Sequence, residues 1–299
     1  MKLSYKVIDN KYSNVKEVLK SYFGISDRLL TKLKKSKKIY LNNINTYTNT
    51  QIKINDLIEV ILNFEEYSEN IVPKKMDLDI IFEDESILVL NKTPNMPVHP
   101  SILHYENSLS NGVQFYYKEN NIKTKIRPVN RLDKDTSGIV VFAKNEYIQE
   151  ALIKQMKTKK FKKEYLAILE GFLKKDFGTI NAPISRKENS IIEREINFSG
   201  DIAITHFKLI KNFEYENKKL CLVNFELETG RTHQIRVHSK HIGHPILGDS
   251  LYGSSSFIIN SQALHAYKIT FIHPISNKKY VFEAPLPNDI NKIINNHFY

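Results

Sequence analysis

The chain has 299 residues, of which 41% are hydrophobic and 26% are charged. This length predicts two domains, or one large domain with a small addition, and the apolar content excludes disorder as the main state. The formal net charge is +11. Such an excess favours a polyanionic partner, nucleic acid first and an acidic membrane second, and a solvated lysine-rich surface is the alternative on charge alone.

Cysteine and histidine usage argues against disulfides and metal sites. The single cysteine, Cys221, cannot form an internal disulfide, and its apolar neighbours are typical of a buried core position. His233 and His238 are five residues apart in a segment predicted to be helical, which puts them on different faces. We therefore expect structural or nucleic-acid-contacting roles for them, and no metal.

No segment of the sequence predicts export or membrane insertion. The N-terminal residues lack the apolar stretch of a signal peptide. No apolar run approaches the roughly 18 residues that a transmembrane helix needs. We expect a cytoplasmic protein without a membrane partner.

The first 62 residues predict two short helices and a small pair of strands. Apolar residues recur at helical spacing over residues 15–23, and Ser26 is a candidate N-cap for a second helix. Residues 39–41 and 58–62 are predicted to be strands.

A basic edge accompanies the second helix. It consists of Lys32, Lys34, Lys35, Lys37 and Lys38. Two short helices, a basic edge and a small hairpin resemble the S4 RNA-binding module, over about residues 13–62. The resemblance implies an RNA-binding domain over residues 1–64, with these five lysines contacting RNA. A solvated helix pair is the alternative.

The rest of the chain predicts a linker and a larger α+β domain. Residues 65–77 are polar and weakly periodic, so we expect a linker there and a second domain over residues 78–299. Two strands around an acidic turn are predicted over residues 80–90. Beyond them, helices and strands mix without a regular βαβ rhythm, which favours a largely antiparallel sheet flanked by helices. No Walker or dinucleotide-binding fingerprint is present, which disfavours an ATP or NAD enzyme.

The strongest candidate for chemistry lies in residues 127–144, where a polar segment runs directly into an apolar strand. Asp133 stands at the mouth of this strand between Arg131 and Lys134, and Gly138 permits close backbone approach. A positive field favours the ionised carboxylate, which can act as a nucleophile. A turn-capping aspartate paired with an arginine is the structural alternative.

This segment resembles the signature of the RluA-like pseudouridine synthases, which reads His-Arg-Leu-Asp, two residues, then Thr-Ser-Gly. Residues 131–133 and 136–138 match it, and Asn130 stands in place of the histidine. Since that histidine is not the family's nucleophile, the difference bears on positioning or substrate choice more than on activity. Other family elements follow in order: Lys163–Ala167, Gly230–His238, Gly243–Asp249, Leu264–Ala266 and Ala284–Pro287. The resemblance spans about residues 78–290.

The resemblance implies a pseudouridine synthase fold and the isomerisation of specific uridines in structured RNA, without a cofactor. It favours 23S ribosomal RNA, with transfer RNA as the other substrate class. By the same resemblance, Asp133 attacks the ribose or assists departure of the base. Tyr165 packs on the target base, Arg231 pairs with Asp133, and Arg131 fills the gap left by the flipped base or contacts a phosphate.

The segment around Arg231 also predicts local structure. Thr229 or Thr232 can cap a helix that follows a strand ending near Leu227. Arg231 would then stand at the helix N-terminus, within reach of a bidentate pair with Asp133.

Two rival functions are weighed against this prediction. A non-catalytic RNA-binding or ribosome-assembly factor of the same fold would be expected to lack part of the catalytic set, yet Asp133, Tyr165 and Arg231 are all present. A glycosidase using Asp133 and Asp135 is disfavoured, because residues two apart in an extended chain do not flank one bond. We expect a monomer.

Overall fold

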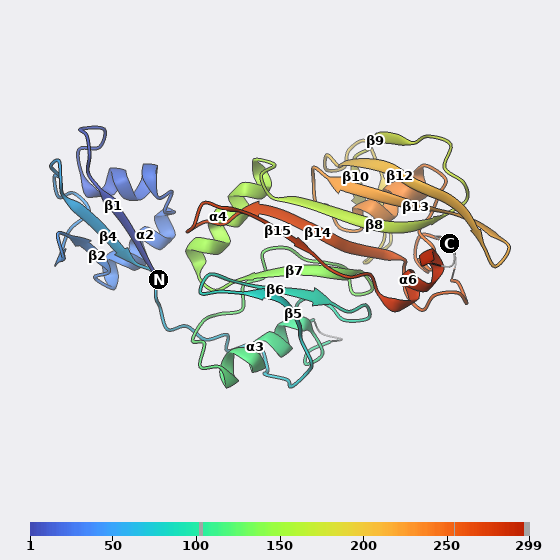
Figure 1. Cartoon of the computed structure of the whole chain (residues 1–299), viewed down its shortest axis with the longest axis horizontal. Helices are drawn as coiled ribbons and strands as arrows, with labels where there is room; N and C mark the ends of the chain where they lie inside the picture. The colour runs from blue at the N-terminus through green and yellow to red at the C-terminus, as the bar shows by residue number, and fades with distance from the viewer. Residues whose placement is uncertain (102–103, 254, 296–299) are drawn as a thin grey trace.

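The structure is a computed structural model that describes residues 1–101, 104–253 and 255–295, so the end of the predicted second domain, 296–299, lies outside it (Figure 1). A four-stranded sheet belongs to an N-terminal module, and a nine-stranded sheet belongs to a larger domain. No helix in the described ranges is long and apolar enough to cross a bilayer.

The N-terminal module packs its helices on a sheet with the strand order β1-β4-β2-β3. Its helices are α1 (Val15–Glu17), the π-helix η1 (Val18–Tyr22) and α2 (Asp27–Lys35), and its strands are β1 (Lys2–Lys6), β2 (Ile39–Leu41), β3 (Ile44–Asn45) and β4 (Leu57–Ile61). Ser26 accepts a hydrogen bond from the Leu29 amide, as expected of an N-cap. Strand β1 was not predicted, because only Leu3 within it is buried.

The large domain is mixed α+β with a largely antiparallel sheet, as predicted. The strand order is β5-β6-β7-β14-β8-β13-β12-β9, with β15 paired to β14, and within the described residues only β7 and β14 run parallel. The strands are β5 (Asp79–Glu83), β6 (Ile87–Lys92), β7 (Ser137–Ala143), β8 (Lys162–Glu170), β9 (Phe177–Asn181), β12 (Ile204–Tyr215), β13 (Lys218–Leu227), β14 (Leu264–Ile272) and β15 (Lys279–Glu283). A separate hairpin pairs β10 (Ile184–Arg186) with β11 (Arg194–Ile196), and the helices are α3 (Leu109–Glu119), α4 (Glu146–Lys157), α5 (Gln234–His241) and α6 (Asn288–Asn295).

Strand β7 is buried at every position because helices cover both faces of the sheet there. Val140 and Phe142 face a core that includes residues of α3, whereas Ile139 and Val141 face a core that includes residues of α4. Alternate side chains of one strand therefore enter two different cores. The covered strand gives a rigid base for the loop that precedes it.

Gly138 allows β7 to approach β14 closely. Its φ is +111°, and a Cβ atom at this position would lie 2.3 Å from the carbonyl oxygen of Ala266. A side chain would therefore clash with the backbone of the neighbouring strand. This contact lies five residues after Asp133 and fixes the position at which the Asp133 loop joins β7.

The N-terminal module lies beside the end of the large domain that carries α4 (Figure 1), and side chains of α2 and its cap contact that helix. The Ser26 hydroxyl donates to Glu150 over 2.8 Å. Arg28 pairs with Glu146 at 3.0 Å. The module is therefore docked on the large domain.

Candidate active site

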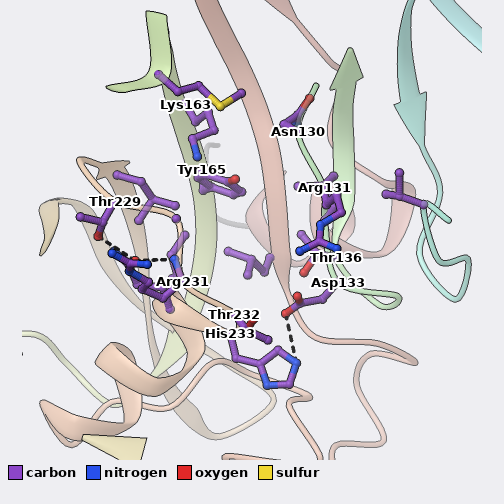
Figure 2. A pocket seen from close by; sticks show the side chains of 18 of the residues that line it. Asn130, Arg131, Asp133, Thr136, Lys163, Tyr165, Thr229, Arg231, Thr232 and His233 are labelled. Carbon is purple, nitrogen blue, oxygen red and sulfur yellow. Dashed lines mark hydrogen bonds and ion pairs between the residues drawn. The ribbon is translucent and has the colours of Figure 1, made fainter. Parts of the chain in front are cut away.

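A pocket of about 1070 Å³ opens where the loop before β7, strand β8 and the start of α5 meet (Figure 2). Asp133 and Arg131 come from the loop, Tyr165 from β8, and Arg231 from the turn before α5. The fold thus brings all four of these predicted site residues to one pocket, although they are spread over about a hundred positions of the sequence.

Asn130 anchors the Asp133 loop to β7. Its amide nitrogen donates to the Ile139 carbonyl over 2.9 Å, and its amide oxygen accepts the Val141 amide over 2.9 Å. Asn130 is buried, and both ends of its amide are bonded to backbone. The residue that stands in place of the family's histidine therefore positions the loop.

Lys92, at the end of β6, also anchors the Asp133 loop. Its ammonium lies 2.8 Å from the Thr93 carbonyl, 2.7 Å from that of Met96 and 2.9 Å from that of Lys134. Burial lowers the pKa of Lys92 to about 7, although the nearby Asp135 opposes this shift. Sequence reasoning missed this role, and the available signal was a lysine ending a strongly apolar strand.

The guanidinium beside Asp133 belongs to Arg236. Its Nη1 donates to Asp133 Oδ2 over 3.1 Å. Its Nε and Nη2 bond the two oxygens of Asp249 at 2.8 and 2.9 Å. Because Asp249 is fully buried, this bidentate pair fixes the orientation that Arg236 presents to Asp133.

The predicted pair between Arg231 and Asp133 is wrong. Arg231 lies on the pocket wall (Figure 2), where its Nε donates to the Ile202 carbonyl over 3.0 Å and its Nη1 lies 3.2 Å from Asp201. Both contacts direct its guanidinium to the segment before β12, so it does not bond the Asp133 carboxylate.

The start of α5 explains this error. The helix begins at Gln234, and its N-cap is His233, not Thr229 or Thr232. The Thr229 hydroxyl instead donates to the Gln234 side chain over 2.8 Å. Arg231 therefore precedes the helix, whereas Arg236 lies within its first turn and faces the pocket.

Tyr165 and Lys163 project from β8 into the pocket (Figure 2). Tyr165 is buried, and burial together with the charge of Asp133 raises the pKa of its phenol. The phenol is therefore neutral at neutral pH and can donate a hydrogen bond. Burial lowers the pKa of the Lys163 ammonium.

Of the five lysines in the predicted basic edge, two contact the chain that leaves the module and three are exposed. Lys32 pairs with Glu66 at 2.6 Å and lies 4.1 Å from the centre of the Phe64 ring. Lys38 lies over the same ring, 4.6 Å from its centre. These two lysines hold the chain that leaves the module, whereas Lys34, Lys35 and Lys37 are exposed.

His238 has a structural environment. Its Nδ1 lies 2.9 Å from the Thr205 hydroxyl and its Nε2 lies 2.9 Å from the Ala182 carbonyl. Within the described ranges, no three or more His, Cys, Asp or Glu side chains gather as metal ligands would.

Comparison with known proteins gives one consistent result. Residues 86–241, just over half of the chain, match the family described as RNA pseudouridylate synthase. The chain is 39% identical over 281 residues to "Uncharacterized RNA pseudouridine synthase YhcT" of Bacillus subtilis, covering 94% of this chain and 92% of that protein. It is 34% identical over 280 residues to "Ribosomal large subunit pseudouridine synthase D" of Blochmanniella floridana, covering 87% and 86%. The fold resembles that of human RNA pseudouridylate synthase domain containing 1, with a TM-score of 0.59 at 24% identity, covering 71% and 84%.

Proposed function

The chain belongs to the RNA pseudouridylate synthase family, and we propose that it converts specific uridines of large-subunit ribosomal RNA to pseudouridine. The related "Ribosomal large subunit pseudouridine synthase D" supports this substrate, as does the S4-like arrangement of the N-terminal module. Transfer RNA is the competing substrate class. Ribosomal RNA as a substrate also implies action in the cytoplasm, and we expect the enzyme to act as a monomer.

The reaction breaks the N-glycosidic bond of a uridine, turns the base and rejoins it to the ribose through C5. C5 loses its proton to solvent and N1 gains one, so the net change is an isomerisation without a change of oxidation state, and the proposed chemistry needs no redox or energy cofactor. A paired uridine must first be flipped out, at a cost of a few kcal/mol that contacts in the pocket offset. The exposed Arg131 stands beside Asp133 at the pocket and can fill the space that the base leaves.

The observation that carries the proposal is the Asp133 carboxylate, held by Arg236 at 3.1 Å in the pocket that Tyr165 also lines. We assign Asp133 either attack on the ribose or assistance to the departing base. Tyr165 packs on the target base, and its neutral phenol can take part in exchange of the C5 proton. Arg236, rather than Arg231, fixes the carboxylate.

We also propose that residues 1–64 are an RNA-binding module, that residues 65–77 are a linker, and that the catalytic domain begins at residue 78. The gap between β4 and β5, which contains no helix or strand, supports this division. The exposed Lys34, Lys35 and Lys37 are then the RNA contacts of the module.

The central test replaces Asp133 by asparagine. We expect Asp133→Asn to abolish tritium release from RNA labelled at uridine C5, while filter binding to the same RNA persists. Asp176→Asn makes the same change on an exposed loop outside the pocket and should react normally. Normal turnover in Asp133→Asn would refute the assignment. Mapping pseudouridines in total RNA with and without the gene identifies the substrate, and an unchanged map would favour a non-catalytic RNA-binding factor.

A further inference from the structure

A short chain of hydrogen bonds fixes the proton of His233. The Arg194 amide donates to the Tyr252 hydroxyl oxygen over 2.8 Å, and His233 Nδ1 lies 2.8 Å from the same oxygen. Tyr252 is buried, so its hydroxyl proton needs an acceptor, which Nδ1 provides. Nδ1 is then unprotonated, and the neutral ring carries its proton on Nε2.

The surroundings of Nε2 are consistent with this tautomer. His233 Nε2 lies 3.8 Å from Asp133 Oδ2 (Figure 2), the oxygen that also accepts the bond from Arg236. A lone pair on Nε2 would face the carboxylate unfavourably, whereas an N–H dipole faces it favourably. The separation is longer than a hydrogen bond, and catalytic hydrogen bonds commonly shorten when substrate binds.

Tyr252 supports both groups that face Asp133. Its hydroxyl holds His233, and its ring lies 5.0 Å from the Arg236 guanidinium. Its backbone amide donates to Asp249, the partner of Arg236. One buried residue therefore orients two donors toward the same oxygen.

The backbone of His233 is held in an uncommon conformation. Its φ is 59° and its ψ is 20°, in the left-handed region, at the N-cap of α5. A non-glycine residue pays roughly 1 kcal/mol or more for this conformation, and such residues cluster at functional sites. The conformation aims the imidazole into the pocket.

We infer that His233 is a positioning residue that, together with Arg236, holds Oδ2 of Asp133 and leaves Oδ1 to meet the nucleotide. This inference rests on the proposed role of Asp133. Within the described residues, the side-chain hydrogen bond and ion pairs of the carboxylate all go to Oδ2. The Asp133 side chain is 27% exposed, so its second oxygen remains available to substrate.

A pair of substitutions at His233 tests the role. His233→Asn keeps a residue type that tolerates the left-handed backbone but is too short to reach Asp133. It should lower the single-turnover rate on the order of 10²-fold, as displaced catalytic groups do, with unchanged RNA affinity. His233→Gln restores an N–H at the position of Nε2 and should recover most of the rate. His241→Asn, on the exposed end of the same helix, is the control and should match the unmodified enzyme.

A pH profile separates this role from a merely structural one. The charged groups that face His233 are Asp133, Arg236, Arg194 and Asp249, and burial keeps its pKa below the ordinary value. Tyr252→Phe removes the donor to Nδ1 and lets the ring bind a second proton. The rate of the Tyr252→Phe variant relative to the unmodified enzyme should then fall as the pH drops below neutral. This fall should be absent in the double variant His233→Gln/Tyr252→Phe.

The outcomes distinguish this inference from the proposed function. A normal rate in His233→Asn, or no recovery in His233→Gln, overturns the inference while an inactive Asp133→Asn leaves the proposed function standing. A pH-independent effect of Tyr252→Phe also overturns it. Activity in Asp133→Asn would instead defeat the proposed function.

Discussion

Two arginines five residues apart illustrate what decides a role at the scale of single residues. Arg231 and Arg236 belong to the same sequence element, and both line the pocket. Arg236 is buried and bonded to Asp249 on one side and Asp133 on the other, whereas Arg231 is 42% exposed and bonded to Asp201. Burial and a fixed partner make Arg236 the one that can hold a carboxylate in place.

We predict that Arg236→Lys lowers kcat on the order of 10²-fold, because an ammonium cannot keep the fork to Asp249 and also reach Asp133. Arg231→Lys keeps the charge at the pocket wall, so we expect little change in kcat. Steady-state kinetics of tritium release measure both. A larger loss in Arg231→Lys than in Arg236→Lys would contradict the assignment.

At the scale of elements, the contact between β7 and β14 places the catalytic loop. The two strands pair in parallel through Ser137 and Gly138 opposite His265 and Ala266. This is the only parallel contact among the paired strands of the described ranges. Because Asp133 lies just before β7, any shift of this contact moves the carboxylate.

Gly138 and Gly243 provide a matched test of that contact. Both have positive φ, but a Cβ at Gly243 meets nothing within 4 Å. Gly138→Ala combines backbone strain with a clash against β14, and should lower the free energy of unfolding by about 3 kcal/mol or more. Gly243→Ala should cost about 1–2 kcal/mol. Urea titrations measure the difference, and equal losses would argue against a close strand contact.

His265, which lies at the same contact, should make the stability of the protein depend on pH. It is fully buried, its Nδ1 lies 2.8 Å from the Ser137 hydroxyl, and burial lowers its pKa to about 4. Between the unfolded pKa of about 6.5 and this value, only the unfolded chain binds the proton, so stability falls as the pH is lowered. We expect a loss of about 2 kcal/mol between pH 7 and pH 5 from this group.

The measurement compares urea unfolding at both pH values for the unmodified protein and His265→Gln. The variant is expected to be less stable at pH 7 but to lose about 2 kcal/mol less on acidification. If the two proteins lose the same free energy between pH 7 and pH 5, His265 is not the responsible group.

At the scale of the whole molecule, ion pairs and hydrogen bonds join the N-terminal module to the large domain. Glu66 connects Lys32 of the module with Arg127 of the large domain. Tyr147 of α4 donates to the Phe23 carbonyl over 3.1 Å. The docking uses Lys32 as a structural cation and leaves Lys34, Lys35 and Lys37 exposed.

RNA affinity should therefore depend on only part of the basic edge. Replacing Lys34, Lys35 and Lys37 by glutamine should weaken RNA binding. It should also reduce the slope of log Kd against log salt concentration by about 2–3. Replacing Lys32 and Lys38 should leave this slope nearly unchanged. Filter binding over a salt series checks both, and a larger slope change in the second variant would contradict the division.

Several elements could be predicted from the sequence because their causes are local. Ser26 caps α2 through its own side chain, and the acidic turn between β5 and β6 is closed by Asp84, which accepts the amides of Ser86 and Ile87. Asp133 and Tyr165 were predicted as site residues from the resemblance of their motifs to those of the family, and the structure places both in one pocket.

The sequence by itself indicated the fold class through periodicity and turn chemistry, and it indicated the family and the segments that build the pocket through resemblance to known motifs. All of these signals lie in short stretches of chain. Only the tertiary structure decided that Arg236 rather than Arg231 meets Asp133. It also decided that His233 begins α5 and that Lys32 faces Glu66 rather than solvent. The physical reason is that the direction of a side chain depends on where a helix starts and on which distant partner is buried beside it.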